Sequence, residues 1–430
     1  MEIVLYMALA FGFYMAWTIG ANDAANAMGT SVGSGAITFK EAVIIAAVFE
    51  FSGAILAGSG VTDTMRKGII DPALFNQMPQ GAEIFALGML ASLMAAAIWL
   101  HFAAFVGWPV STTHSIVGAI AGFGVASVGM SNVDFGTLGI IVSSWVVSPV
   151  AGGLLAFLIF TAIRKTIIDT PNPVLSVKKW GPAFAFPIFL VLALVLFTKG
   201  LKNVDLPLDT YGIAIISVLT GIIASTVLWW ILRKIQTPTD VDRGEHETLR
   251  DVHHSRVERV FRYLQTITAC FVAFAHGSND VANAIGPLAG IVSLFDGTTF
   301  QGSDALGSAV PVPTWVLMIG GVGILVGLAT YGYKVIETIG TKITDITPSR
   351  GFAAEFGAAT TILIGSKIGL PLSTTHTIVG AVIGVGFARG MNALNLQIIW
   401  QIAKAWVYTI PFTAVLTVVI FKVLQYFFLV

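Results

Sequence analysis

Residues 20–29 read GANDAANAMG, and residues 277–286 read GSNDVANAIG. In both stretches an aspartate stands between two asparagines inside a long apolar segment. A charge at the centre of a membrane-spanning helix costs about 2.5 to 3.5 kcal/mol on insertion scales, so a carboxylate placed there indicates a functional role. The same polar positions recur in both halves of the chain, which indicates an internal duplication.

The composition indicates that the chain is embedded in a lipid bilayer. Of 430 residues, 56% are hydrophobic and only 11% are charged, and the mean hydropathy is +0.85. These values are typical of a polytopic membrane protein. Basic and acidic residues number 23 each, so no charge excess indicates a nucleic-acid partner. Cys270 is the single cysteine, which excludes an internal disulfide.

Apolar windows long enough to cross a bilayer predict about 12 transmembrane helices. They lie at 3–28, 41–60, 83–105, 109–127, 136–162, 183–199, 211–233, 261–292, 314–334, 351–366, 371–388 and 398–424. The most basic segment is 233–262, and the positive-inside rule places it in the cytoplasm. The chain is then a multi-pass protein of the cell (inner) membrane with both termini outside.

A second motif is also duplicated: PVSTTHSIVG at 109–118 returns as PLSTTHTIVG at 371–380. Counting spans gives the two copies of each motif opposite directions, so the halves are inverted repeats, an architecture of many secondary transporters. The predicted fold is all-α, with two inverted repeats and broken helices. Its predicted parts are a first repeat (1–162), additional helices (163–236), a cytoplasmic linker (237–260) and a second repeat (261–430).

Four carboxylates lie inside the predicted spans: Asp23, Glu50, Asp280 and Glu355. Such groups need a partner, and the surrounding asparagine oxygens suit a hard cation such as sodium. Protonation is the competing explanation. Asn22 and Asn26 are four residues apart, as are Asn279 and Asn283, so each pair shares one helix face. The flanking glycines are places where a helix can unwind and release carbonyl groups for ligation.

The two hydroxyl runs predict an anion site. A proline followed by three hydroxyl residues is typical of the first turn of a helix, where free N–H groups and the helix dipole favour anions. Ser111, Thr112 and Thr113 facing Ser373, Thr374 and Thr375 would suit a tetrahedral oxyanion, with phosphate as the candidate. Alternatively, the hydroxyls bond back to their own helices. His114 and His376 are either ligands or proton carriers, or simply interhelical hydrogen-bond donors.

With these four motifs, the chain resembles the inorganic phosphate transporter (PiT) family of sodium- or proton-coupled symporters. The resemblance covers both halves, in the family's order. It implies phosphate uptake by alternating access and a homodimer, and it implies that Glu50 and Glu355 are two further carboxylates needed for transport. The implied phosphate-binding residues are Ser111, Thr112, Thr113, Ser373, Thr374, Thr375, Asn22 and Asn279. The implied sodium-binding residues are Asp23, Asn26, Asp280, Asn283, Glu50 and Glu355.

The sequence therefore predicts a symporter that couples inward phosphate transport to the sodium gradient. Its expected partners are inorganic phosphate, sodium ions, the lipid bilayer and a second copy of the chain, with no nucleic acid, no metal but sodium and no cofactor. The alternative is a proton-coupled phosphate or sulfate permease of the same family. A hydrolase with a nucleophilic triad of Ser111 or Ser373, His114 or His376 and an aspartate would not need two inverted copies of its site. An open channel fits paired broken helices less well than alternating access does.

Overall fold

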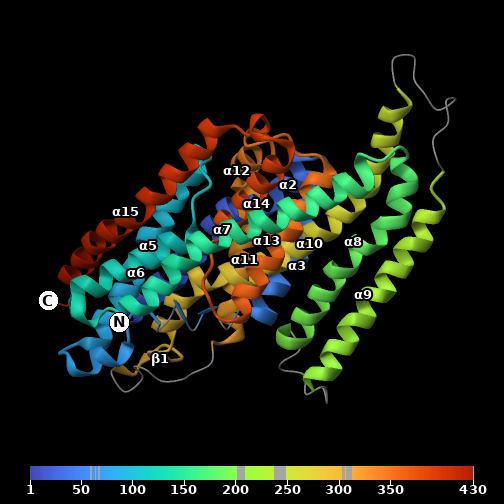
Figure 1. Ribbon diagram of the computed structural model, residues 1–430. Helices are drawn as coiled ribbons and strands as arrows, with labels where there is room; N and C mark the ends of the chain where they lie inside the picture. The colour runs from blue at the N-terminus through green and yellow to red at the C-terminus, as the bar shows by residue number, and fades with distance from the viewer. Residues whose placement is uncertain are drawn as a thin grey trace.

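The computed structural model describes the chain except residues 59–60, 63, 66–67, 201–208, 237–247, 303–305, 307–311 and 430. The described part is nearly all helical, as expected, apart from a short hairpin of β1 (Phe295–Asp296) and β2 (Thr299–Phe300) (Figure 1). The α-helices are α1 (Glu2–Ile19), α2 (Ala25–Gly33), α3 (Phe39–Ala57), α5 (Gly81–Val106), α6 (Thr112–Val128), α7 (Phe135–Ile163), α8 (Pro173–Val195), α9 (Thr210–Arg233), α10 (Leu249–Val292), α11 (Thr314–Tyr331), α12 (Tyr333–Glu337), α13 (Pro348–Lys367), α14 (Thr374–Arg389) and α15 (Leu396–Phe428). Single π-helical turns are η1 (Gly20–Ala24), η4 (Arg164–Ile168), η5 (Leu196–Gly200) and η8 (Thr338–Lys342), and short 3-10 turns are η2 (Pro72–Gln77), η3 (Met130–Asn132) and η9 (Met391–Ala393).

Each of the twelve apolar windows corresponds to a helix. Seven helices in the described part are long and apolar enough to cross a membrane by themselves, namely Glu2–Gly33, Gly81–Val106, Phe135–Ile168, Pro173–Thr198, Thr210–Arg233, Thr314–Tyr331 and Leu396–Phe428. The helices outside this group are shorter, as α6 is, or carry buried polar motifs, as α10 does. The chain is therefore a multi-pass membrane protein.

Helix α10 begins earlier than the sequence indicates, because a capping box fixes its start. The Asp251 amide donates to Thr248 Oγ1 over 3.2 Å, and the Thr248 amide donates to Asp251 Oδ2 over 2.9 Å. This reciprocal pair satisfies two amide groups that a helix start leaves unpaired. Residues 249–260, assigned above to the linker, belong to this helix.

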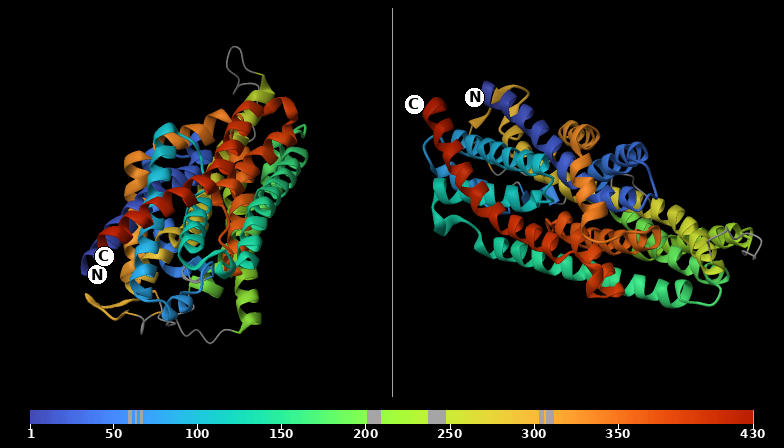
Figure 2. Two further views of the ribbon diagram at one scale, coloured as in Figure 1. Left: turned by 90° about the vertical axis from the view of Figure 1, so that its left-hand side faces the viewer. Right: turned by 90° about the horizontal axis from the view of Figure 1, so that it is seen from above.

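The long helices lie side by side in one elongated bundle (Figure 1). Helices α8 and α9 pack against each other at one side of the bundle, where α8 contacts α10. The two chain termini lie close together at one end, and α10 begins at the opposite end (Figures 1 and 2). This placement agrees with a topology in which both termini are on one side of the membrane and the start of α10 is on the other.

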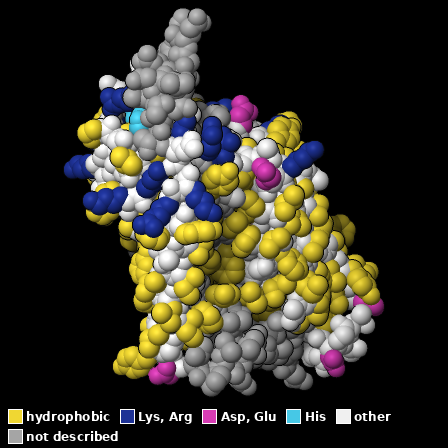
Figure 3. Space-filling model, turned by 90° about the vertical axis from the view of Figure 1, so that its right-hand side faces the viewer, with side chains coloured by type: hydrophobic (Ala, Val, Ile, Leu, Met, Phe, Trp, Pro, Cys, Tyr) yellow, Lys and Arg dark blue, Asp and Glu magenta, His cyan; other side chains and the backbone are white. Residues whose placement is uncertain are grey.

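The outer flank of the molecule is apolar along most of its length, and lysine and arginine side chains gather at one end (Figure 3). At the end of α9, the Arg233 guanidinium lies 3.5 Å from the centre of the Trp229 ring, and Lys234 Nζ lies 3.5 Å from that of Trp230. Tryptophan beside a basic side chain is typical of a membrane–water interface. This basic end is the one that the positive-inside rule places in the cytoplasm.

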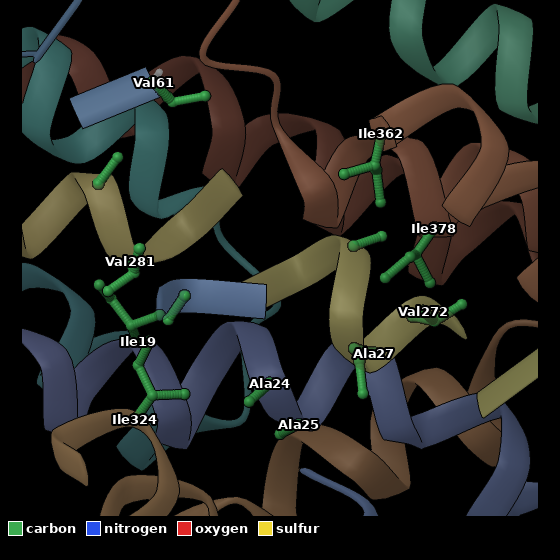
Figure 4. Packing of buried hydrophobic residues seen from close by; sticks show 14 of the residues in the cluster. Ile19, Ala24, Ala25, Ala27, Val61, Val272, Val281, Ile324, Ile362 and Ile378 are labelled. Carbon is green, nitrogen blue, oxygen red and sulfur yellow. The ribbon is translucent and has the colours of Figure 1, made fainter. Parts of the chain in front are cut away.

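The two motif helices are packed into the bundle by small residues. Helix α1 and η1 pack on α11, and α2 packs on α12 and η8, while α10 packs on α3. Ile19, just before the first motif, lies between Ile324 of α11 and Val281 of α10 (Figure 4). A Cβ on Gly20 would overlap the backbone carbonyl of Ile324, and a Cβ on Gly277 would overlap that of Glu50.

These contacts correct the expectation that the flanking glycines unwind their helices. Gly20 has φ −59° and ψ −42° and opens a π-helical turn, and the second motif continues as unbroken helix within α10. The physical reason is helix contact: only glycine lets the neighbouring backbone come so close. The breaks lie instead before the hydroxyl runs, where α5 ends at Val106 and α13 ends at Lys367.

Candidate functional site

Two motif helices and two helix starts meet inside the bundle. Asn22, Asp23 and Asn26 from the first motif and Asn279, Asp280 and Asn283 from the second are each at most 1% exposed. The six hydroxyl residues of the two runs are buried to the same degree. Buried polar groups are retained only when they are hydrogen-bonded or await a partner. The contacts of each group therefore decide what the site can hold.

The two hydroxyl runs form helix N-termini, as predicted. Ser111 caps α6 by accepting a hydrogen bond from the His114 amide, and Ser373 caps α14 by accepting one from the His376 amide, both over 3.2 Å. These are ordinary N-caps, in which a serine oxygen satisfies an amide of the first turn. The prolines precede the caps by two residues and do not form the first turn as expected, so the two serines define the helix starts.

Each motif contacts the hydroxyl run of the other half. Thr375 Oγ1 donates to Asp23 Oδ1 over 2.9 Å and accepts from Asn26 Nδ2 over 2.9 Å. In the other direction, Asn283 Nδ2 donates to Thr113 Oγ1 over 3.3 Å. The predicted cation and anion groups are thus one continuous network, and neither half of the chain builds it alone.

The helix starts also hold the aspartates directly. The Thr112 amide donates to Asp23 Oδ2 over 3.3 Å, and Thr374 Oγ1 donates to Asp280 Oδ2 over 2.5 Å. These donors are among those predicted to bind an oxyanion. In this arrangement the carboxylates occupy donors of the anion site.

Asn22 and Asn279 hold the broken segments in place. Asn22 Nδ2 donates to the carbonyl oxygen of Trp108, and Asn279 Nδ2 donates to that of Leu372, both over 2.9 Å. Each carbonyl belongs to the stretch that leads into a hydroxyl run. These asparagines therefore contact the predicted anion segments, although through backbone carbonyl groups.

Sequence reasoning missed His276, which lies at the centre of the site. Its Nε2 is 3.0 Å from Asp280 Oδ2 and its Nδ1 is 3.1 Å from Glu50 Oε1, and the side chain is fully buried. Ligand atoms of Asp23, His276 and Asp280 all lie within 4.8 Å of one another. The imidazole thus joins Glu50 to the motif. The sequence feature that could have identified it is the position of His276 directly before the second motif, because the equivalent position before the first motif is Ile19.

Glu355 has different partners from the other three carboxylates. It accepts hydrogen bonds from Thr30 and Ser31 of α2 and from Gln265 and Thr268 of α10, over 2.5 to 2.9 Å. Thr30 and Ser31 follow the first motif on α2, and Gln265 and Thr268 precede the second motif on α10. Glu355 is therefore a buried carboxylate held by neutral donors, apart from the Asp23, His276 and Asp280 cluster.

Several buried oxygen atoms in the described site have no hydrogen-bond donor within the protein. They include the Oδ1 atoms of Asn22, Asn26 and Asn283 and the Oγ1 atom of Thr112. The amide nitrogens of these asparagines already donate hydrogen bonds, which leaves their oxygens available to a further partner. Neutral oxygens beside carboxylates are the ligands that a hard cation prefers.

The two motif histidines pack against each other and against two tryptophans rather than joining this cluster. The His114 and His376 rings are 4.2 Å apart, and they lie 3.7 Å from Trp145 and 3.5 Å from Trp406, respectively. His376 Nδ1 is also 3.3 Å from the carbonyl oxygen of Trp145. The Ser111 and Ser373 hydroxyls accept from the histidine amides and not from the imidazoles, so these described residues do not assemble the serine–histidine pair of a hydrolase triad.

Comparison with known proteins agrees with this geometry. Residues 19–417 match the model of the phosphate transporter family. A phosphate-permease relative from Haemophilus influenzae is 46% identical over 425 residues, covering 99% of this chain and 97% of its own. The inorganic phosphate transporter 2-1, chloroplastic, of Arabidopsis thaliana is 44% identical over 438 residues, covering 97% of this chain and 72% of its own.

A solved structure described as the sodium-dependent phosphate transporter superposes with a TM-score of 0.84. It is 37% identical, and the match covers 99% of both chains. The family model matches most of the chain, and the relatives are 44 to 46% identical to it. These matches identify the chain as a membrane transporter and not an enzyme. This chain belongs to the phosphate transporter family.

Proposed function

We propose that this chain is a symporter that couples inward phosphate transport to the sodium gradient. The observation that carries the proposal is the set of unpartnered oxygens of Asn22, Asn26 and Asn283 beside two buried aspartates. Sodium bound there would neutralise the carboxylates. The sodium-dependent phosphate transporter of similar fold supports this choice of ion. No cofactor other than the coupling ion is needed.

In this proposal, coupling arises because sodium and phosphate share hydrogen-bond donors through the aspartates. Asp23 accepts from the Thr112 amide and the Thr375 hydroxyl. Sodium bound to the carboxylate would offset its charge and release these donors to the phosphate oxygens. Each ligand would then stabilise the state that binds the other, which is the physical meaning of coupling.

Alternating access is part of the proposal, because the site is closed on all sides. Motif side chains that are at most 1% exposed cannot exchange ions with water unless helices move. Reciprocal contacts between the halves support two inverted repeats: Gly20 of η1 meets Ile324 of α11, while Gly277 of α10 meets Glu50 of α3. Rocking one repeat against the other would open the site to either face in turn.

The test is uptake of radiolabelled phosphate into proteoliposomes that contain the purified protein. An inward sodium gradient is compared with a proton gradient of equal size, with and without excess unlabelled sulfate. Uptake driven by sodium and insensitive to sulfate supports the proposal. Uptake driven only by protons would instead make the aspartates proton carriers, and competition by sulfate would identify a sulfate permease.

We also propose that the protein forms a homodimer in the membrane. The outer faces of α7 and α15 carry exposed apolar side chains such as Val146, Val150, Val407 and Val415, which lipid or a second copy would cover. Mass measurement of the purified protein by light scattering, with detergent subtracted, tests this proposal. A mass near that of one chain at all concentrations would contradict it.

A further inference from the structure

A second polar cavity lies at the basic end of the molecule, away from the transport site. It measures about 470 Å³ and lies among the ends of α7, α10, α13 and α14. Its polar lining includes Arg164, Asp169, His254, Arg350 and Arg389. Arg389 is fifteen residues after Thr374 along α14, a distance of about 22 Å at 1.5 Å per residue. The cavity is therefore separate from the motif residues.

Three guanidinium groups from three helices converge on this cavity. Arg350 and Arg389 both donate to one neutral acceptor, the carbonyl oxygen of Asp345, over 3.0 and 3.3 Å. Arg164 donates to the carbonyl oxygen of Ala388 over 2.5 Å. A guanidinium has five N–H donors, so these bonds leave donors on each group for a further ligand.

The nearby carboxylates compensate this positive charge incompletely. Both oxygens of Glu258 are engaged by Thr347 and by the amide and hydroxyl of Ser349, over 2.7 to 2.9 Å, at the start of α13. Asp169 lies 3.3 Å from Arg164 Nε. The Asp345 carboxylate is 4.0 Å from Arg389 Nη2 and its side chain is 88% exposed. Glu258 and Asp169 also line the cavity, so its three arginines face two carboxylates, and the Asp345 carboxylate beside Arg389 is solvated.

We infer that this cavity binds a phosphoryl oxyanion at the cytoplasmic face, distinct from the phosphate being transported. Arginine forks match the geometry of phosphate oxygens, and basic cavities between helices on this side of a membrane suit lipid headgroups. His254 Nε2, a buried atom without a hydrogen-bond partner in the described protein, adds a further polar contact. The phosphoryl group comes either from an anionic phospholipid or from free phosphate in the cytoplasm.

Chemical protection of the arginines tests this inference on the unaltered protein. Phenylglyoxal modifies guanidinium groups, and peptide mass spectrometry reports the rate at each residue. The protein is compared in nanodiscs of phosphatidylcholine, the same nanodiscs with added inorganic phosphate, and nanodiscs containing phosphatidylglycerol. Arg250 and Arg259, exposed on α10, are reference residues in the same chain.

We expect modification of Arg164 and Arg389 to slow by at least about threefold at a ligand concentration twice the dissociation constant. The reference residues should be unaffected. Protection by phosphatidylglycerol alone identifies a lipid headgroup, and protection by inorganic phosphate alone identifies a soluble anion. Absence of protection in both arms, or equal protection of Arg250, would overturn the inference.

Two variants separate this cavity from the transport site. The phosphate arm is repeated with Thr113→Ala/Thr375→Ala, which removes hydroxyls of the proposed transport site and should leave the protection intact. Loss of protection in that variant would mean that phosphate acts from the transport site, and the inference would fail. Native mass spectrometry of Arg350→Gln/Arg389→Gln should show loss of bound phosphatidylglycerol if lipid is the ligand. Arg250→Gln/Arg259→Gln, with the same change in net charge, should retain it.

Discussion

Asp23 and Asp280 are the residues on which the proposed coupling depends. Each carboxylate accepts hydrogen bonds from the start of a helix, and Asp23 also receives one from the opposite half of the chain. Both aspartates lie near His276, which supplies a third polar group to the cluster. Changes in charge at these atoms should alter transport more than they alter folding.

Asp23→Asn and Asp280→Asn should each reduce sodium-driven phosphate uptake by at least about tenfold, corresponding to about 1.4 kcal/mol or more. The amide keeps the shape of the side chain but removes the charge that would bind the cation. Uptake into proteoliposomes measures the effect, and size-exclusion chromatography checks that the protein is folded. Asp134→Asn, at the exposed start of α7, is the control and should transport normally, because asparagine is also a good N-cap. Full activity of either motif variant would refute the cation assignment.

Sodium should increase the affinity for phosphate, and phosphate should increase the affinity for sodium by the same factor. In the proposed mechanism, a cation bound to Asp23 would release the Thr112 amide and the Thr375 hydroxyl, and linkage requires the effect to be reciprocal. A factor of about 5 to 150 is typical of such coupling. Isothermal titration in detergent measures both affinities, with choline replacing sodium in the reference. A phosphate affinity that is equal in sodium and choline would disprove shared donors.

At the scale of elements, close contacts between helices fix the positions of the site residues. Gly20 and Gly277 let the motif helices approach the backbones of α11 and α3. In the same two interfaces, Gly327 of α11 lies against the Trp17 carbonyl group and Gly53 of α3 lies against the Phe274 carbonyl group. Because backbones touch, neither helix can shift without moving the other. This is how carboxylates from α3 and α10 are held together around His276.

Gly20→Ala and Gly277→Ala should both destabilise the protein by about 1 to 3 kcal/mol or more, because a methyl group would overlap a carbonyl of the neighbouring helix. Thermal unfolding in detergent reports the change as a lower apparent Tm. Gly139→Ala in α7 is the matched control: the added methyl group meets open space, and helix propensity favours alanine by about 0.5 to 1 kcal/mol. Motif variants as stable as the control would show that the helices are not in tight contact.

At the scale of the whole molecule, the loops form two groups at opposite ends of the bundle. The residues after α14 contact the α12–α13 connection, since the Asn395 amide donates to the carbonyl oxygen of Ile343. The segment after α6 pairs with the one before α5 through the bridge between Ile70 and Val133. Arg350 of α13 and Arg389 of α14 flank the first pair of loops, and the second pair lies near the termini (Figure 1). A single orientation in the membrane thus follows from the distribution of charge.

Met391→Cys should be labelled by an impermeant maleimide only after cells are permeabilised, and Met130→Cys should be labelled in intact cells. Both side chains are exposed, at 55% and 67%, and they lie in the two opposite sets of loops. The native thiol is first removed by Cys270→Ala, which gives the unlabelled control. The reverse pattern of labelling would invert the topology and place the basic cavity outside the cell.

The sequence by itself determined the fold class, the duplicated motifs and the presence of a helix start at each hydroxyl run, whereas the structure moved each start from the proline to Ser111 and Ser373. These follow from local chemistry: apolar length, a hydroxyl that caps a helix, and a polar pattern that repeats. The tertiary structure decided which residues meet. His276 joins Glu50, Glu355 has neutral partners elsewhere, and the motif glycines serve contact rather than unwinding, because each outcome depends on a helix far away in the chain.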